Sequence, residues 1–273
     1  LALLFLFAIA VTASCGGGGG GGGGNGGGGA PSGGGGGGST PINELYVSNG
    51  NSITVYSRTA DGNIAPVRTI TGAATNLSAS RGIAVDTANN EIFVANWGSN
   101  SITVYSRTAD GNIAPVRTIT GAGTNLNSPF GITLDTANNE IFVANWANSI
   151  TVYSRTADGN IAPVRTITGA GTNLSAPLGI ALDIANNEIF VANATNDSIT
   201  VYSRTADGNI APVRTITGAA TNLNAPYGIA LDTANNEIFA ANTGADSITI
   251  YSRTADGNIA PVRTITGAAT NLN

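Results

Sequence analysis

Carboxylates and arginines are the only charged side chains that this chain offers for chemistry, and both recur at regular spacing. The 273 residues include sixteen acidic and eleven basic residues, every basic one an arginine, with one cysteine and no histidine. Histidine-dependent catalysis, Schiff-base chemistry on lysine and an intrachain disulfide are therefore excluded. A net charge of −5 argues against nucleic-acid binding. What remains is carboxylate acid–base chemistry, or Ca²⁺ held by carboxylate and amide oxygens.

Two carboxylates recur as a pair, first at Asp86 and Glu91 and then in three later copies. An acid–base pair needs different surroundings for its two members, and near-identical copies supply no such asymmetry. We therefore expect the aspartates to accept hydrogen bonds from turn amides, the glutamates to be solvated, and the arginines to pair with these acids across strands or repeats. No EF-hand or RTX spacing occurs, so we assign no metal site and expect no cofactor, with Ca²⁺ binding left open as an alternative.

The sequence is built from five copies of one unit. A string that opens Ser-Ile-Thr-Val-Tyr-Ser-Arg begins at Ser52 and, with one Val-to-Ile change in the last copy, recurs at spacings of 49, 48, 49 and 49 residues. A second block, which opens Gly-Ile-Ala-Val-Asp at Gly82, recurs between these strings. Self-similarity at this period is typical of repeat architectures.

Each unit predicts four short strands, at 82–86, 91–96, 101–107 and 114–119 in the second copy. These segments are rich in β-branched and aromatic residues, and turn residues separate them. Asn89-Asn90 fits a tight hairpin between the first two strands. Asp110-Gly111-Asn112 fits a turn between the last two, with the glycine in the left-handed conformation. No segment shows sustained helical periodicity.

Four antiparallel strands in a unit of about 49 residues predict an all-β fold, a β-propeller of four-stranded blades. The segments at 129–135 and 140–145 resemble NHL repeats, and the run from Ile92 through Val104 is similar to YVTN-type propeller repeats. Lactonase-like propellers share the same general blade. This resemblance covers residues 43–273 and implies the fold, whereas a fold does not determine function.

The five blades are predicted at about 43–72, 82–121, 131–169, 179–218 and 228–267. The first begins at its second strand, with Glu44, and lacks the innermost one. Propellers usually contain four to eight blades and close by completing one blade with both termini. Five blades could in principle close, but the strand that would complete the first blade is missing. We therefore expect these blades to be a fragment of a six- or seven-bladed propeller.

The N-terminal segment predicts export. Residues 1–11 form an apolar run shorter than the roughly 20 residues that span a bilayer, which is typical of a signal peptide. The segment Thr12-Ala13-Ser14-Cys15 resembles the lipobox of bacterial lipoprotein precursors. That resemblance implies a signal peptide over 1–14, lipidation of Cys15, and, because Gly16 follows, an outer-membrane or cell-surface location. An ordinary secretory signal is the alternative. The glycine-rich segment 15–42 is predicted to be a flexible tether.

The repeats differ most in two places, which the strand order puts on one face of the predicted propeller. One is the loop between the second and third strands, and the other is the residue before the glycine of the first strand. Tryptophan, tyrosine and arginine dominate binding hot spots, and aromatic rings stack on sugars. We therefore predict a ligand-binding surface here; interblade packing is the alternative. Its candidate residues are Arg81, Trp97, Phe130, Trp146, Leu178, Asn196, Asp197, Tyr227 and Asp246.

These observations predict a lipid-anchored, non-enzymatic propeller that recognises a protein, peptide or polysaccharide at a bacterial surface. It would contact the membrane only through its lipid and would not bind nucleic acid. A lactonase- or lyase-like enzyme acting at the channel mouth is the first alternative, and a passive spacer made by repeat expansion is the second.

Overall fold

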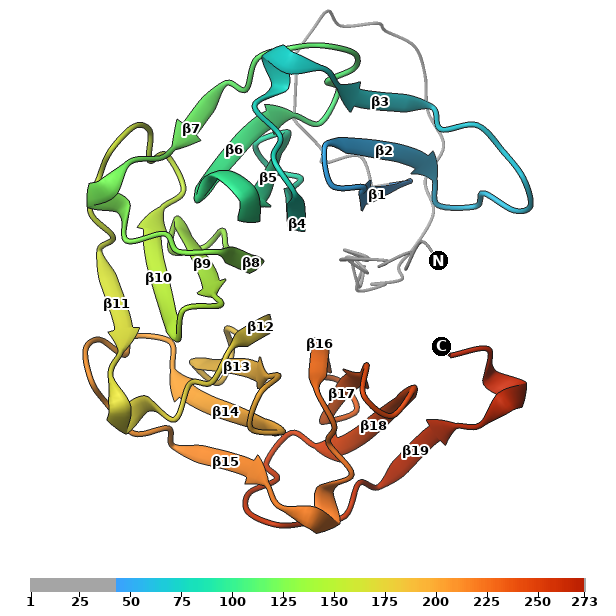
Figure 1. The fold of residues 1–273 in the computed structure, drawn as a ribbon, viewed down its shortest axis with the longest axis vertical. Coiled ribbons are helices and arrows are strands. Elements are labelled where there is room, and N and C mark those ends of the chain that lie inside the picture. The colour runs from blue at the N-terminus through green and yellow to red at the C-terminus, as the bar shows by residue number, and fades with distance from the viewer. Residues whose placement is uncertain (1–42, 273) are drawn as a thin grey trace, which may run out of the picture.

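Nineteen strands form five antiparallel sheets that follow one another around a central channel (Figure 1). The computed structural model describes residues 43–272. The predicted signal peptide, Cys15 and the glycine-rich tether lie outside these residues. Within residues 43–272 we find no helix that is long and apolar enough to cross a membrane.

The first sheet, blade 1, has three strands, and blades 2 to 5 have four each. Blade 1 contains β1 (Glu44–Ser48), β2 (Ser52–Ser57) and β3 (Arg68–Thr71). Blade 2 contains β4 (Ser80–Asp86), β5 (Glu91–Asn96), β6 (Ser101–Ser106) and β7 (Arg117–Ile119). Blade 3 contains β8 (Pro129–Asp135), β9 (Glu140–Asn145), β10 (Ser149–Ser154) and β11 (Arg165–Thr168). Blade 4 contains β12 (Pro177–Asp183), β13 (Glu188–Asn193), β14 (Ser198–Ser203) and β15 (Arg214–Thr217). Blade 5 contains β16 (Pro226–Asp232), β17 (Glu237–Asn242), β18 (Ser247–Ser252) and β19 (Arg263–Thr266).

The strands of each four-stranded blade pair in chain order from the channel outward, so β4, β8, β12 and β16 surround the channel. This arrangement confirms the predicted all-β propeller. The predicted tight hairpin is also confirmed: Asn90 has a φ of 59°, and the amide of Asn89 donates to Asp86 Oδ1 at 3.0 Å.

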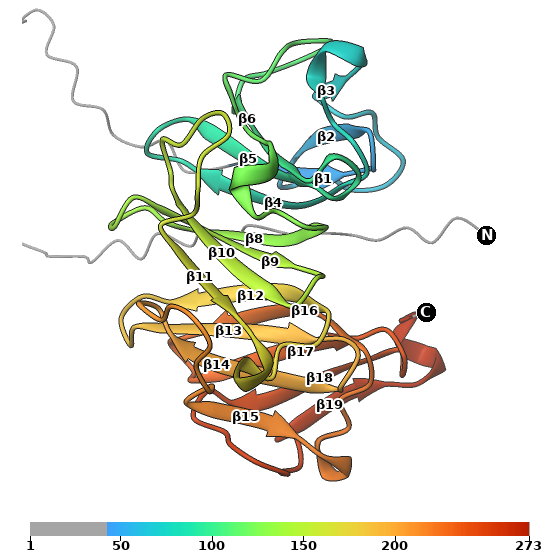
Figure 2. The ribbon, with the colours of Figure 1, turned by 60° about the vertical axis from the view of Figure 1, so that its left-hand side comes forward.

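The core lies between blades, because each sheet buries side chains on both of its faces. Figure 2 shows blades 3, 4 and 5 lying face to face. In blade 2, Phe93 and Val104 pack toward blade 3, whereas Val94 and Tyr105 pack toward blade 1. We call these the forward and backward faces of a blade. Because both faces of a blade are buried, a strand such as β5 has a nearly continuous apolar sequence instead of alternating apolar and polar residues.

The outer strand and its connection differ from the prediction. The last strand of blade 2 begins at Arg117 rather than at 114, and residues 110–112 do not form a tight turn within the blade. Gly111, with a φ of 75°, instead pairs with β3 of the preceding blade. Asp110 Oδ1 accepts the amide of Thr69 at 2.8 Å, and Asn112 Oδ1 accepts the amide of Ala74 at 2.8 Å. We call residues 110–112 and their copies the clamp loop, since each ties its blade to the one before.

Candidate functional site

A break in strand pairing positions the variable residue of each innermost strand. The pairing of β4 with β5 shifts between Ser80 and Ile83, and β8, β12 and β16 show a corresponding shift. A bulge of this kind redirects a side chain out of the regular ladder. The residues at the shift are Arg81, Phe130, Leu178 and Tyr227.

Four of the predicted aromatic side chains form one continuous cluster at this end of the channel. The ring of Trp97 meets that of Trp146 with centroids 5.5 Å apart and that of Phe130 with centroids 5.7 Å apart. Phe130 meets Tyr227 of blade 5 at 4.9 Å. All three pairs are edge-to-face, an arrangement that the quadrupoles of aromatic rings favour. We call these four residues, together with Arg81, the aromatic cluster.

The cluster is anchored at its base and exposed at its rim. Arg81 lies over the rings of Trp97 and Phe130, with its guanidinium carbon 5.8 and 5.7 Å from their centroids. Phe130 is buried, whereas 42% of the Trp146 surface is exposed. Burial raises the pKa of Tyr227 above its ordinary value. The surface therefore combines aromatic faces with one cation.

The remaining predicted residues have other surroundings. Leu178 is buried, with 1% of its surface exposed. Asp197 is exposed, and its Oδ1 accepts the amide of Ala225 at 2.7 Å, which links blade 4 to the segment before blade 5. Asn196 Oδ1 accepts a hydrogen bond from Ser198 at 2.9 Å, and Asp246 is exposed in the copy of this loop in blade 5. The prediction that these polar residues bind a ligand stays untested.

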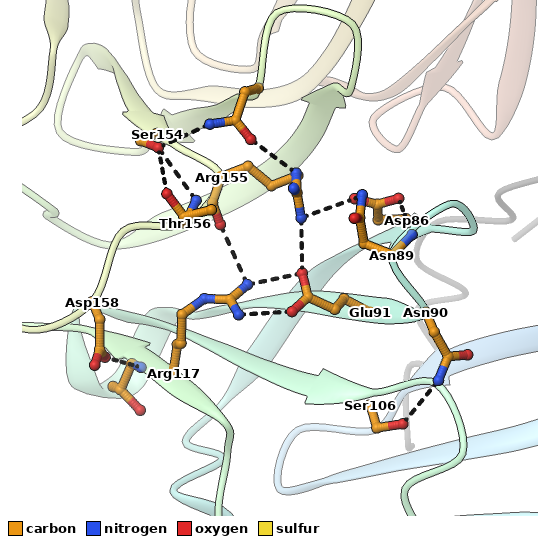
Figure 3. A network of polar contacts seen from close by, with 12 residues as sticks. Asp86, Asn89, Asn90, Glu91, Ser106, Arg117, Ser154, Arg155, Thr156 and Asp158 are labelled. Carbon is orange, nitrogen blue, oxygen red and sulfur yellow. Dashed lines mark hydrogen bonds and ion pairs between the residues drawn. The ribbon is translucent and has the colours of Figure 1, made fainter.

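The opposite end of the channel carries an ion network between blades (Figure 3). Arg117 of β7 makes two hydrogen bonds to Glu91, at 2.7 and 2.8 Å. Arg155, which follows β10 in the next blade, lies 3.3 Å from Asp86 and 3.1 Å from Glu91. The Glu91 side chain is only 15% exposed. The prediction of solvated glutamates is therefore wrong for Glu91, Glu140 and Glu188, because two arginines cover each of these three.

The same network joins blade 3 to blade 4 and blade 4 to blade 5, through Arg204 and Arg253. The predicted pairing of the arginines with these acids is thereby confirmed for these blades. A carboxylate held by two guanidinium groups accepts their hydrogen bonds and is poorly placed to take a proton from a substrate. Within the described residues, no group of three or more His, Cys, Asp or Glu side chains could hold a metal ion.

A cavity of about 450 Å³ lies inside the ring of innermost strands and extends to the hairpin end, away from the aromatic cluster. Its lining combines aliphatic residues such as Ile132, Leu134 and Leu182 with the polar residues Asp86, Thr87 and Thr136. The sequence analysis did not identify this cavity. A signal was present, since the residues that follow the glycine of each innermost strand are apolar in every copy up to the terminal aspartate, apart from Thr133.

The fold and these contacts define a β-propeller built from near-identical blades. A family model described as "Lactonase, 7-bladed beta-propeller" matches residues 165–270. This match supports the predicted similarity to lactonase-like propellers.

Two solved structures show the same fold at low sequence identity. A chain of the nidogen/laminin complex is 16% identical, with a TM-score of 0.62 over 82% of this chain and 76% of that one. The WD40 β-propeller domain of Doa1 is 12% identical, with a TM-score of 0.58 over 82% of this chain and 66% of that one. A search of curated protein sequences finds no match. These likenesses concern the fold alone.

Proposed function

We propose that this chain is a non-enzymatic binding module whose ligand docks on the aromatic cluster. The observation that carries the proposal is that Trp97, Phe130, Trp146 and Tyr227, which come from three blades, meet at one channel mouth. They occupy the positions at which otherwise near-identical repeats differ, and the Trp146 ring is exposed there. A protein, a peptide or a polysaccharide fits this surface, because aromatic rings serve both as protein hot spots and as platforms for sugars.

The proposal includes attachment to the cell surface through Cys15. It rests on the lipobox-like segment that ends at this cysteine and on the glycine-rich stretch after it. A flexible tether raises the effective concentration of the propeller near the membrane. Incorporation of labelled palmitate by the chain, and its loss in a Cys15→Ser variant, would test this attachment.

Intrinsic fluorescence offers a direct test of binding, because the only two tryptophans of the chain both belong to the aromatic cluster. Oligosaccharides and peptides from the bacterial envelope would be titrated into the protein. We expect a bound ligand to shift the tryptophan emission. Trp146→Ala should weaken binding by about thirtyfold or more, as for a hot-spot residue, and should barely change the melting temperature because the ring is half exposed.

The matched control is Ile184→Ala, which removes an exposed apolar side chain (43% exposed) next to the hairpin at the other end. This variant should bind like the unmodified protein. If Trp97→Ala and Trp146→Ala lost stability and binding in equal measure, the cluster would be packing rather than a binding surface. If no envelope component bound at all, the passive-spacer alternative would be favoured.

An enzymatic role at the other end of the channel is the second candidate. The match to the lactonase family model and the cavity that Asp86 helps to line favour it. Hydrolysis of a panel of lactones by the chain, abolished by substitutions in the cavity but unaffected by Trp146→Ala, would support the enzyme and contradict the binding module.

A further inference from the structure

Arg81 is the one arginine of the chain that does not belong to the repeat. Of the eleven arginines, five follow the third strand of a blade and five open its outer strand. Arg81 instead occupies the bulge of β4, where the other innermost strands carry Phe130, Leu178 and Tyr227. A cation at this position therefore has to be explained by something other than the repeat.

The charge of Arg81 has no carboxylate partner in the described part of the chain. By contrast, each arginine that opens an outer strand forms an ion pair of 2.6 to 2.8 Å with a glutamate. Within residues 43–272 the Arg81 side chain forms no ion pair and no hydrogen bond, and its Nε is buried without an acceptor. The carboxylates of Asp86 and Glu91, in the same blade, belong to the network at the opposite end of the channel. Since a partly buried charge without a partner costs free energy, a bound anion would stabilise this site.

The rings around Arg81 determine where its guanidinium group lies. The guanidinium carbon is 5.8 Å from the centroid of Trp97 and 5.7 Å from that of Phe130. Burial raises the pKa of Tyr227, and the charge of Arg81 partly offsets that rise, so the cation also lies near the phenol of blade 5. These three rings come from blades 2, 3 and 5, all of them described. A guanidinium that stacks on a ring face still presents its planar fork of N–H donors at its edge.

We propose that the aromatic cluster binds an acidic polysaccharide, with the carboxylate of a uronic acid unit on Arg81 and the apolar face of a neighbouring sugar ring on Trp146. This inference rests on the proposed binding function and names its ligand class. A guanidinium group binds a carboxylate through two parallel hydrogen bonds. The Trp146 ring is 42% exposed and meets Trp97, over which Arg81 lies, so the stacking surface and the carboxylate site are adjacent.

A polysaccharide is favoured over a peptide because backbone amides of the surrounding loops are already paired. The amide of Gly98 donates to the carbonyl of Ser78 at 3.0 Å, and the amide of Trp146 donates to that of Ser128 at 3.0 Å. Asn100 Oδ1 accepts the amide of Ser128 at 2.7 Å. An extended peptide gains affinity from main-chain hydrogen bonds, for which these amides are not free. A sugar unit needs only ring faces and side-chain donors, which the aromatic cluster offers.

Pairs of oligosaccharides that differ only in their carboxylates test this assignment on the full chain. Oligomers of galacturonic, glucuronic and mannuronic acid, and the methyl ester of each, would be titrated while tryptophan emission is recorded. We expect at least one acidic oligomer to bind, and its ester, which keeps the ring but loses the charge, to bind about tenfold or more weakly. Arg81→Gln should lower the affinity for the acid to that for the ester and leave the affinity for the ester unchanged. Arg81→Lys, which keeps the charge but not the fork, should give an intermediate affinity.

Arg58→Gln is the matched control, because it removes the same charge from an exposed arginine whose copy Arg155 belongs to the network at the other end of the channel. This variant should bind the acidic oligomer like the unmodified protein. The ligand class would be overturned if no acidic oligomer bound or if acid and ester bound equally. It would also be overturned if Arg81→Gln weakened both equally, as expected when Arg81 only packs against the rings.

The failure of this inference can be distinguished from the failure of the proposed function. A neutral oligosaccharide or a peptide whose binding is lost in Trp146→Ala would retain the binding module while overturning the acidic ligand. If neither these probes nor the acidic oligomers bound, both proposals would be overturned.

Discussion

The glycine of each innermost strand sets how closely neighbouring blades approach at the channel. A Cβ atom placed on Gly82 would lie 2.5 Å from the carbonyl oxygen of Phe130 in the next blade. Backbone cannot move away as a flexible side chain can, so a larger residue here must separate two innermost strands. Gly228 in blade 5 has no such neighbour in the described chain, and its nearest contact would be Ala241 at 3.7 Å.

This difference predicts that the same substitution destabilises the protein at Gly82 but has little effect at the equivalent Gly228. Gly82→Ala should destabilise the protein by about 1–3 kcal/mol, the usual cost of overpacking. Gly228→Ala should stay within about 0.5 kcal/mol of the unmodified protein, as for a substitution away from such features. Urea denaturation of both variants would measure the difference. Equal effects would show that the close approach of β4 to β8 does not limit packing.

At the scale of elements, the clamp loop connects two blades, whereas its sequence predicts only a turn within one blade. Asp110 and Asn112 accept backbone amides from the preceding blade, which lies about 40 residues earlier in the chain. The side chains that would favour a local turn therefore make contacts between blades instead. The outer strand begins only after this loop, three residues later than predicted.

Removing the acceptors of one clamp loop should loosen the contact between two neighbouring blades. Asp110→Ala combined with Asn112→Ala leaves two amides without their partners and should cost about 1–3 kcal/mol, at 0.5–1.5 kcal/mol for each hydrogen bond. The same pair of changes at Asp61 and Asn63 should barely change the free energy of unfolding, because no described blade precedes blade 1. Thermal unfolding at low protein concentration would compare them. A large loss at Asp61 and Asn63 would contradict the assignment of the loop to interblade contacts.

The sequence predicted what local pattern and repetition determine. Strand β5, the Asn89-Asn90 hairpin and the left-handed glycine of the clamp loop follow from short-range preferences, and the fold follows from the period. The partner of the clamp loop and the burial of Glu91 did not follow, because both depend on contacts between blades. Glu91 is covered by Arg155, which is 64 residues away in the sequence. The aromatic cluster was found because its members break the repeat, whereas the buried position of Leu178 was not foreseen.

At the scale of the whole molecule, four buried tyrosines connect the blades and make stability depend on alkaline pH. Tyr105, Tyr153, Tyr202 and Tyr251 each donate to a carbonyl of the preceding blade. Burial raises the pKa of Tyr105 and of Tyr202 to about 12 and raises the pKa of Tyr153 and of Tyr251 as well. A tyrosine in the unfolded chain ionises at its ordinary pKa of about 10.

A raised pKa stabilises the fold fully below about pH 10, and that contribution disappears as pH rises toward about 12, because only the unfolded chain releases the proton in this range. We therefore expect the melting temperature to fall steeply between about pH 10 and 12. Arginines stay charged there, so the ion network should not contribute to the fall. A Tyr105→Phe variant should melt lower at neutral pH and lose less on raising the pH, since one ionising group is gone. An unchanged pH slope in that variant would show that another group drives alkaline unfolding.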